Sequence, residues 1–277
     1  MTDPRVSPAA PLAAIAVQFS EQAREYAVSR AHAEGATRTL LVEHLQPVAD
    51  EILLDVGSGP AHTALAFAPY VARVIAFDVS GAMLHAARLA ARRAAVDGEP
   101  GEPLAPLEAV RGDAHALPFG DRAFDLVTIR SAAHHFADLD RALAESRRVL
   151  KRGGRLGIAD GVVPDDDPEL DAFINALDRL HDPTTVRDRS AKEWREALER
   201  AGLRVDFADE RTFDLAEPRS LTAWIALAGG SSQVLAEARR MLLTAPKRIK
   251  DALKVRTSGD DLTFDLPKLV ITAKRVD

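Results

Sequence analysis

The feature that most constrains this chain is a short apolar run that ends in a glycine turn. Ile52-Leu53-Leu54-Asp55-Val56 leads directly into Gly57-Ser58-Gly59-Pro60. Short apolar runs bounded by glycine are typical of strands that are buried on both faces of a parallel sheet. Glycine allows the backbone to turn sharply and to approach a ligand with no side chain in between. The segment therefore predicts a buried strand followed by a ligand-binding turn.

The chain then alternates between helical and strand-like patterns as far as residue 160. Met83, Ala86, Ala87 and Ala90, for example, share one face of a helix. Strand–helix alternation of this kind predicts a parallel sheet covered by helices on both faces. We expect helices at 62–70, 81–96 and 139–150, the last stopped by Gly153-Gly154, and strands at 74–77, 107–110, 124–129 and 156–159.

The flanking segments have a different character. Residues 20–50 are helical and interrupted at Gly35, and Ser20-Glu21-Gln22 is typical of a helix N-cap. Further on, Ser190 and Glu193 have the spacing of a capping box, which predicts the start of a helix. Beyond residue 160 we expect helices at 169–181 and 191–201, a helical insertion around 221–244, and strands within 203–213 and 262–273.

Composition argues against several classes of function. The formal net charge is −6, whereas nucleic-acid binding needs a basic stripe. There is no cysteine, which excludes disulfides and thiolate chemistry and fits a reducing compartment. No segment reaches the roughly 18 apolar residues of a membrane span, and the apolar stretch 9–19 lacks the flanks of a signal peptide. We therefore expect a cytoplasmic protein with no nucleic-acid partner and no membrane span.

The second strand-like run ends at Asp78, about 20 residues after the glycine turn, where an acidic residue can accept hydrogen bonds from both ribose hydroxyls. The alternative is that Asp78 caps the helix that starts near Ser80. His62 stands at the third glycine position of the dinucleotide fingerprint. That replacement disfavours a pyrophosphate at the helix N-terminus and suits a nucleoside with an amino-acid tail.

Several further motifs follow in a fixed order, and together they cover roughly residues 45–160. They are Leu54-Asp55-Val56-Gly57-Ser58-Gly59; Phe77-Asp78-Val79-Ser80 with Met83-Leu84; Gly112-Asp113-Ala114 with Leu117-Pro118-Phe119; Phe124-Asp125-Leu126-Val127; and Arg130, His134-His135-Phe136 and Val149-Leu150-Lys151-Arg152-Gly153-Gly154. In this order and spacing the chain resembles the UbiE-like branch, named for ubiquinone and menaquinone biosynthesis, of class I S-adenosylmethionine-dependent methyltransferases.

The resemblance implies that S-adenosylmethionine is the methyl donor and S-adenosylhomocysteine the product. It implies that Asp78 binds the ribose hydroxyls and that Asp113 accepts from the adenine amino group. The Ala114 backbone N–H would donate to the adenine ring, and Arg130 would lie beside the amino-acid end. Core packing is the alternative role for Met83. The residues implied along the methionine part are Asp55, Gly57 and Gly59, with Ser58 in the turn, and those implied against adenine are Val79 and Met83.

The N-terminal helix resembles a lid that folds over the cofactor in relatives. Tyr26, Ser29, His32 and Gly35 match its Y-x-x-S-x-x-H-x-x-G pattern, and a spacing of three places the first three on one helical face. Tyr26 is therefore expected to bind the cofactor. The alternative is a helix that is merely packed on the sheet. Downstream, Thr185 stands where the family usually has a histidine, which puts the acceptor contact of that histidine in doubt.

Methyl transfer from a sulfonium needs the acceptor and the methyl carbon held in line in a water-poor pocket. A phenol or a carbon acid must also lose a proton. His134 and His135 follow the fourth predicted strand, at the carboxyl end where open α/β sheets place their sites, so either could be this base. The alternative gives one histidine a structural role and the other a role in orienting the loop. No metal site is expected, because adjacent histidines on an irregular segment rarely chelate one ion together.

The predicted fold is α/β, a Rossmann-like doubly wound sheet of seven strands with a C-terminal antiparallel strand pair. We expect one domain, with a helical lid in 1–45, a cofactor-binding core in 46–160, and acceptor-side helices with the last two strands in 161–277. The acceptor is expected to be a small apolar molecule, aromatic or quinone-like, and the protein a monomer or homodimer. Two alternatives stay open: a related protein that binds the cofactor without transferring methyl, and a nicotinamide-dependent oxidoreductase.

Overall fold

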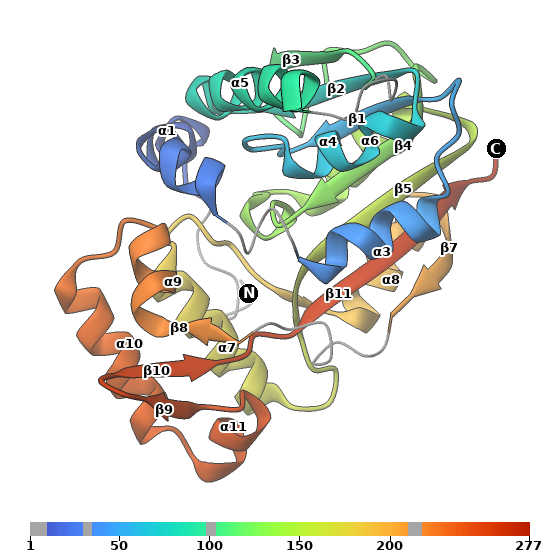
Figure 1. The fold of residues 1–277 in the computed structure, drawn as a ribbon. Helices are drawn as coiled ribbons and strands as arrows, with labels where there is room; N and C mark the ends of the chain where they lie inside the picture. Colours follow the sequence, from blue (N-terminus) through green and yellow to red (C-terminus); the bar gives the residue numbers. More distant parts are fainter. Residues whose placement is uncertain (1–9, 30–34, 98–103, 210–217) are drawn as a thin grey trace.

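The computed structural model describes residues 10–29, 35–97, 104–209 and 218–277, and its centre is one large mixed sheet (Figure 1). In spatial order its strands are β3 (Leu107–Arg111), β2 (Arg73–Asp78), β1 (Ile52–Val56), β4 (Phe124–Arg130), β5 (Leu150–Val163), β11 (Lys268–Arg275) and β7 (Leu203–Ala208). The first five run parallel, whereas β11 runs antiparallel to both β5 and β7. The short strand β6 (Arg189–Ser190) pairs with the end of β5.

Helices cover both faces of this sheet because successive residues of each strand point to opposite sides. Leu53 belongs to the apolar cluster on one face, and Leu54, the next residue, to the cluster on the other. The doubly wound α/β sheet with its antiparallel C-terminal pair is therefore confirmed. The first face is covered by α3 (Ala36–Leu45), α4 (His62–Phe67) with the 3-10 turn η1 (Ala68–Tyr70), and α5 (Gly81–Asp97); the second by α6 (Leu139–Val149) and α8 (Ala191–Arg200).

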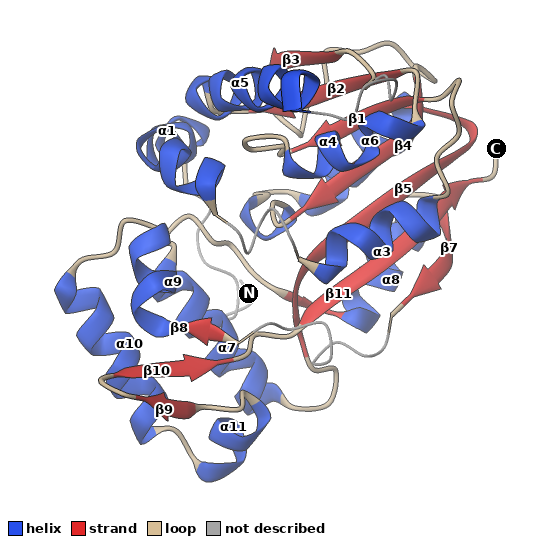
Figure 2. Ribbon diagram, viewed as in Figure 1, coloured by secondary structure: helices blue, strands red, loops and turns tan. Residues whose placement is uncertain are grey.

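A smaller lobe is built mostly from the C-terminal third of the chain and lies below the large sheet in Figure 2. It has its own apolar core, which includes Trp224 and Phe264, and its own antiparallel sheet in the order β8-β10-β9. Its elements are α7 (Pro168–His181), β8 (Arg219–Ser220), α9 (Leu221–Leu227), α10 (Ser232–Thr244), α11 (Lys247–Ala252), β9 (Arg256–Ser258) and β10 (Asp261–Phe264).

The N-terminal helix α1 (Leu12–Val28) lies between the large sheet and this lobe (Figure 1). It packs on α5 of the former and touches α9 of the latter. The expected N-cap at Ser20 is wrong, because Ser20 lies inside α1 and its hydroxyl donates back to the Ala16 carbonyl at 2.6 Å. A helical serine can satisfy itself in this way, so the triplet gives no reliable signal of a helix start.

The expected stop of α6 at two glycines is also corrected. The helix ends at Val149, and Gly153 and Gly154 lie inside β5, where the register against β4 shifts. Gly153 has a φ of +78°, and a Cβ on Gly154 would lie 2.9 Å from the Lys151 carbonyl oxygen. The glycines therefore serve an irregularity of the strand rather than a helix end.

The segment predicted as one strand, 262–273, forms two strands in different sheets. Asp265, Leu266 and Pro267 separate β10 from β11, and the Asp265 amide leaves the ladder to donate to the Leu253 carbonyl at 2.8 Å. Proline cannot donate to a ladder, so the strand pairing is interrupted before Lys268.

Arg275, at the end of β11, ties the last strand to the helix before β5. Its Nη1 donates to the carbonyls of Arg147, Arg148 and Leu150 at 2.9, 3.2 and 2.9 Å. The last carbonyls of a helix have no intrahelical partner. The buried guanidinium therefore caps the C-terminus of α6.

We expect Arg275→Ala to lower the free energy of unfolding by about 2 kcal/mol, since it removes hydrogen bonds from a charged donor. Arg275→Lys keeps the charge but not the planar fork, so it should recover only part of the loss. Urea unfolding followed by circular dichroism measures both. An alanine variant as stable as the parent would mean that the carbonyls need no protein donor.

Candidate active site

The glycine turn after β1 is held against the end of β2 by main-chain hydrogen bonds. The amides of Gly57 and Ser58 both donate to the Phe77 carbonyl, at 2.8 and 3.0 Å. Gly57 and Gly59 have φ values of +68° and +52°, a region that favours glycine. A Cβ on Gly57 would also lie 2.5 Å from the Cβ of Ala132. Steric and conformational constraints therefore both require glycine at position 57.

Asp78 joins the glycine turn to the helix that follows β2. Its Oδ2 accepts from the Gly59 amide at 2.8 Å and its Oδ1 from the Ser80 amide at 2.8 Å. Burial raises the pKa of this carboxyl, although the amides from Ser80, Gly59 and Val79 oppose the rise. Each oxygen keeps a second acceptor site for a ribose hydroxyl. Asp78 can therefore cap the helix and bind the ribose hydroxyls at the same time.

A cavity of about 250 Å³ opens beside this turn. Its walls come from the glycine turn, the ends of β2, β3 and β4, and α1. Of the residues implied to bind the cofactor or to act as a base, those that line it are Tyr26, Gly57, Ser58, Gly59, Asp78, Val79, Met83, Asp113, Ala114, Arg130 and His135. The sequence motifs thus converge on one cavity, while Asp55 and His134 lie outside its walls.

Asp55 lies beneath the turn instead of against the cofactor cavity. Its carboxylate accepts from the Ala64 amide at 3.1 Å and from the Thr128 hydroxyl at 2.7 Å. Burial raises the pKa of Asp55 to about 7, although both hydrogen bonds oppose the rise. Asp55 thereby ties β1 to β4 and to the first turn of α4. Asp55 thus supports the turn from beneath, and its contact with the methionine part stays a prediction.

Asp113 and its neighbour Ala114 follow β3 and form the opposite wall. Asp113 Oδ1 accepts from the amide and from Nδ1 of His115, at 2.9 and 2.6 Å. The His115 contact fixes the carboxylate at the cavity wall. Asp113 Oδ2 is not part of these bonds, and it is the atom suited to an adenine amino group.

Helix α1 covers this cavity with aromatic side chains. Phe19 packs edge-on against both Tyr26 and His135, with ring centroids 5.9 and 5.1 Å apart. Burial raises the pKa of Tyr26, and the Tyr26 carbonyl lies 3.0 Å from Nε2 of His62. The helix ends at Val28, so Ser29 is its C-cap and does not continue the helical face. His32 lies outside the described residues.

A second cavity, of about 550 Å³, adjoins the first on the side of the small lobe. Its polar wall includes His134, Asp178, His181, Asp182 and Asp188. The two cavities share Phe19, Tyr26, Arg130, Ser131 and His135. These shared residues mark the place where the two cavities meet.

His134 faces only the second cavity and is held by Asp160, which follows in β5. Its Nδ1 lies 2.6 Å from Asp160 Oδ1, and its amide donates to Asp160 Oδ2 at 3.1 Å. Burial alone would lower the pKa of His134, but the ion pair with Asp160 outweighs it and raises the pKa. The amides of Val186 and Arg187 both donate to the His134 carbonyl, so the loop after α7 is anchored here.

His135 faces both cavities and has different partners. Its Nδ1 lies 3.1 Å from the hydroxyl oxygen of Thr184, which donates its proton to Asp182 Oδ1 at 2.6 Å. Nε2 lies 3.9 Å from Asp182 Oδ2. Burial and the neighbouring His134 lower the pKa of His135 to about 4. The 3-10 turn η2 (Ala133–His135) thus sends two adjacent histidines to separate acids.

Several residues in or beside the second cavity were not among the sequence candidates. Asp160 had a usable signal, since it is an acid near the carboxyl end of a predicted strand. Asp182 and Thr184 flank a proline in a segment where the family pattern concerns only Thr185, which does line the cavity. Trp224 lies in the helical insertion and had no signal beyond its size.

Comparison with known proteins agrees with this geometry. A family model described as "Methyltransferase domain" matches residues 54–158. Over 255 residues the chain is 33% identical to the uncharacterized methyltransferase YcgJ of Bacillus subtilis, covering 91% of this chain and 96% of that protein. The chain therefore belongs to the class I S-adenosylmethionine-dependent methyltransferases. It takes its methyl group from S-adenosylmethionine, which excludes the oxidoreductase alternative.

Within that class, the likeness to YcgJ extends to three dimensions. The YcgJ crystal structure superposes with a TM-score of 0.75 at 30% identity, over 87% of this chain and 98% of the other. The demethylmenaquinone methyltransferase of Thermobifida fusca is 39% identical over 123 residues, which are 44% of this chain and 49% of that enzyme. The match to the quinone methyltransferase thus spans about half of its length. Among the described residues, no helix is long and apolar enough to cross a membrane.

We expect Asp78→Ala to weaken S-adenosylhomocysteine binding at least about tenfold, since it removes the acceptor of the ribose hydroxyls. Asp78→Asn keeps the shape of the side chain but lacks the charge, so its affinity should fall between those of the parent and Asp78→Ala. Calorimetric titration measures the affinities, and thermal unfolding checks the fold. Unchanged affinity in a folded alanine variant would refute the ribose contact.

Asp55 should make stability depend on pH. Its pKa is about 7 in the folded protein and about 3.9 when unfolded, so the folded state holds more protons between these values. The free energy of unfolding should therefore fall as pH rises from about 4 to about 7. Asp55→Asn keeps one acceptor and adds a donor that Thr128 can accept, so it should remove this part of the slope. Urea unfolding at about pH 5 and about pH 7 compares the two proteins; equal slopes would contradict the assignment.

Proposed function

We propose that this methyltransferase acts on a small, largely apolar molecule, aromatic or quinone-like, by in-line transfer, with His135 as the base. The observation that carries the proposal is the junction of the two cavities, where His135 lines both. A donor methyl and an acceptor atom can face each other only across such a junction. The residues at that point are the ones able to orient the reacting atoms and to exclude water.

The apolar character of the acceptor is supported by the side of the second cavity formed by the small lobe. The rings of His181 and Trp224 stack there with centroids 4.0 Å apart and planes at 13°. Ala223, Leu227 and Leu266 add further apolar surface. The stacked rings and this apolar surface suit a ring-containing molecule, whose polar end would lie toward the charged residues of the same cavity.

His135 is suited to take a proton because its tautomer is fixed by its partners. Asp182 can only accept, so the Thr184 hydroxyl donates to it and its oxygen accepts from Nδ1–H of His135. Nε2 is then left with its lone pair. The lowered pKa keeps His135 neutral at pH 7, and Asp182 lies near Nε2 to stabilise the imidazolium that forms.

The relatives named for quinone substrates add support of a limited kind. Demethylmenaquinone methyltransferases and UbiE proteins match this chain over about half of its length. Residues after 158, where the match to the family model ends, build much of the second cavity. The acceptor class proposed here therefore depends on the cavity rather than on those names.

The test is acceptor-dependent formation of S-adenosylhomocysteine, followed by mass spectrometry. The panel contains phenols, hydroquinones, naphthoquinols and apolar carbon acids, together with hydrophilic amines and carboxylates of similar size. We expect turnover with at least one ring-containing apolar compound and none with the Asp78→Ala variant. Turnover confined to the hydrophilic group would overturn the proposed acceptor class.

With an acceptor that must lose a proton, His135→Ala should lower kcat about 100-fold or more, because general bases contribute about 10²–10⁴-fold. Thr184→Val keeps His135 but removes the hydroxyl that fixes its tautomer, so kcat should fall less than in His135→Ala. Cofactor affinity, measured by calorimetry, should stay within about threefold in both. A His135→Ala enzyme with the parent kcat would show that another group takes the proton.

A further inference from the structure

His134, the histidine that the proposed reaction leaves unused, belongs to a buried cluster of potential metal ligands. His134, Asp160 and Asp188 each offer one ligand atom, and these atoms all lie within 4.8 Å of one another. The three residues come from η2, from β5 and from the loop before β6. Only the folded chain brings ligands from separate elements together, as in a preformed metal-binding site.

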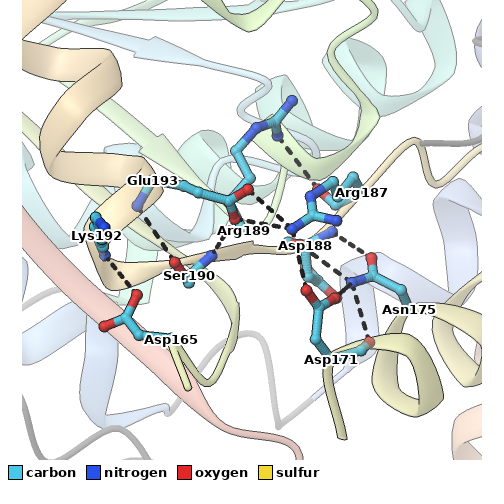
Figure 3. A network of polar contacts seen from close by, with 9 residues as sticks. All are labelled: Asp165, Asp171, Asn175, Arg187, Asp188, Arg189, Ser190, Lys192 and Glu193. Carbon is cyan, nitrogen blue, oxygen red and sulfur yellow. Dashed lines mark hydrogen bonds and ion pairs between the residues drawn. The ribbon is translucent and has the colours of Figure 1, made fainter. Parts of the chain in front are cut away.

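Asp188 is fixed from behind by a network of polar contacts (Figure 3). Its amide donates to Asn175 Oδ1 at 2.8 Å, and Asn175 Nδ2 donates to the Asp188 carbonyl at 3.2 Å. Asn175 is held in turn by Asp171 at 2.7 Å, and Arg187 bridges Asp171 and Glu193. The backbone of Asp188 is therefore placed before any ligand arrives.

The Asp188 side chain has unused bonding capacity. The residue is 2% exposed, and its Oδ2 has no hydrogen-bond partner. It lines the second cavity beside His134. The position beneath it is Gly161, where an added Cβ would overlap the Asp188 carboxylate. A buried carboxylate oxygen without a partner is costly, so its presence at a cavity wall points to a ligand.

The charges around the cluster leave an excess of acids. Asp160, Asp178 and Asp188 carry a formal charge of −3, and Lys268, which interacts with all three, supplies +1. Arg219 also lines this cavity and interacts with Lys268. Lys268 and Arg219 bring the formal sum to −1, so negative charge remains that a bound cation would offset.

We propose that His134, Asp160 and Asp188 form a binding site for a divalent first-row transition metal ion in the acceptor cavity. His134 Nδ1 and Asp160 Oδ1 are 2.6 Å apart and share a hydrogen bond, and a metal ion would replace the shared proton and hold the two atoms somewhat further apart. An imidazole with two carboxylates favours ions such as Mn²⁺, Fe²⁺ or Zn²⁺ over Mg²⁺ or Ca²⁺, whose ligands are oxygens. No metal was expected from the sequence, because that expectation concerned only a site shared by the adjacent His134 and His135.

The value of such an ion to the reaction rests on the proposed function. A bound ion would take an acceptor oxygen as a further ligand and lower the pKa of its hydroxyl. His134 would then hold the ion while His135, at the junction, receives the proton. The two adjacent histidines would have separate tasks on one acceptor.

The test is a titration of the full-length, chelator-treated protein with Mn²⁺, followed by electron paramagnetic resonance and by calorimetry. We expect saturable binding of one ion per chain, with or without S-adenosylhomocysteine. Asp188→Asn and His134→Ala should each weaken binding at least about tenfold. Glu25→Gln removes a negative charge from the exposed edge of the same cavity, where solvent screens it, so it should change the affinity by less than about twofold.

Binding of S-adenosylhomocysteine to each variant shows that the fold and the cofactor site persist. It also separates the two proposals, since the metal titration needs no acceptor and no turnover. Absence of saturable Mn²⁺ binding to the parent would overturn the site. Equal affinity in parent, Asp188→Asn and His134→Ala would place the ion elsewhere and overturn it as well.

Discussion

The join between the ends of β1 and β2 is the contact on which the rest of the site depends. Two amides of the glycine turn share the Phe77 carbonyl, and Asp78 accepts the third, from Gly59. This arrangement works only because Gly57 has no side chain to meet Ala132. It determines where the first cavity opens, and Asp55 supports it from below by tying β1 to β4 and α4. The burial that raises the pKa of Asp55 is unfavourable for its charged form, and the hydrogen bonds that hold this turn oppose that effect.

The sequence was most informative where structure follows from short stretches of chain. The doubly wound sheet and the residues of the first cavity were predictable because strand ends and turns carry local patterns, and because parallel strands bring their carboxyl ends to one edge. Errors arose where a local pattern had two physical meanings. Glycine pairs end helices but also relieve strand irregularities, as Gly153 and Gly154 do. Asp55 matched a family motif, but that match could not tell contact with a ligand from support beneath it.

The second cavity was largely beyond sequence reasoning, for a physical reason. Asp182, Asp188 and Trp224 line it, and Asp160 lies beside it against His134, through tertiary packing of the small lobe on the sheet. No spacing along the chain records that packing. The two histidines show the same limit. They are neighbours in sequence, yet the 3-10 turn directs one to Asp160 and the other to Thr184. The different hydrogen-bond environments of the two histidines depend on partners that lie far away in the sequence.

Helix α1 touches every part of this arrangement. Its Ser20 hydroxyl lies 3.0 Å from that of Ser80 beside the cofactor turn, and Gln18 donates to Asp182 and Gln22 to the Ala228 carbonyl in the small lobe, each at 2.5 Å. Phe19 and Tyr26 line both cavities. If the two cavities hold donor and acceptor as proposed, one helix covers both molecules. A displacement of α1 that frees the spent cofactor would then also break the contacts that enclose the methylated product, which would link the exits of the two molecules kinetically through a single element.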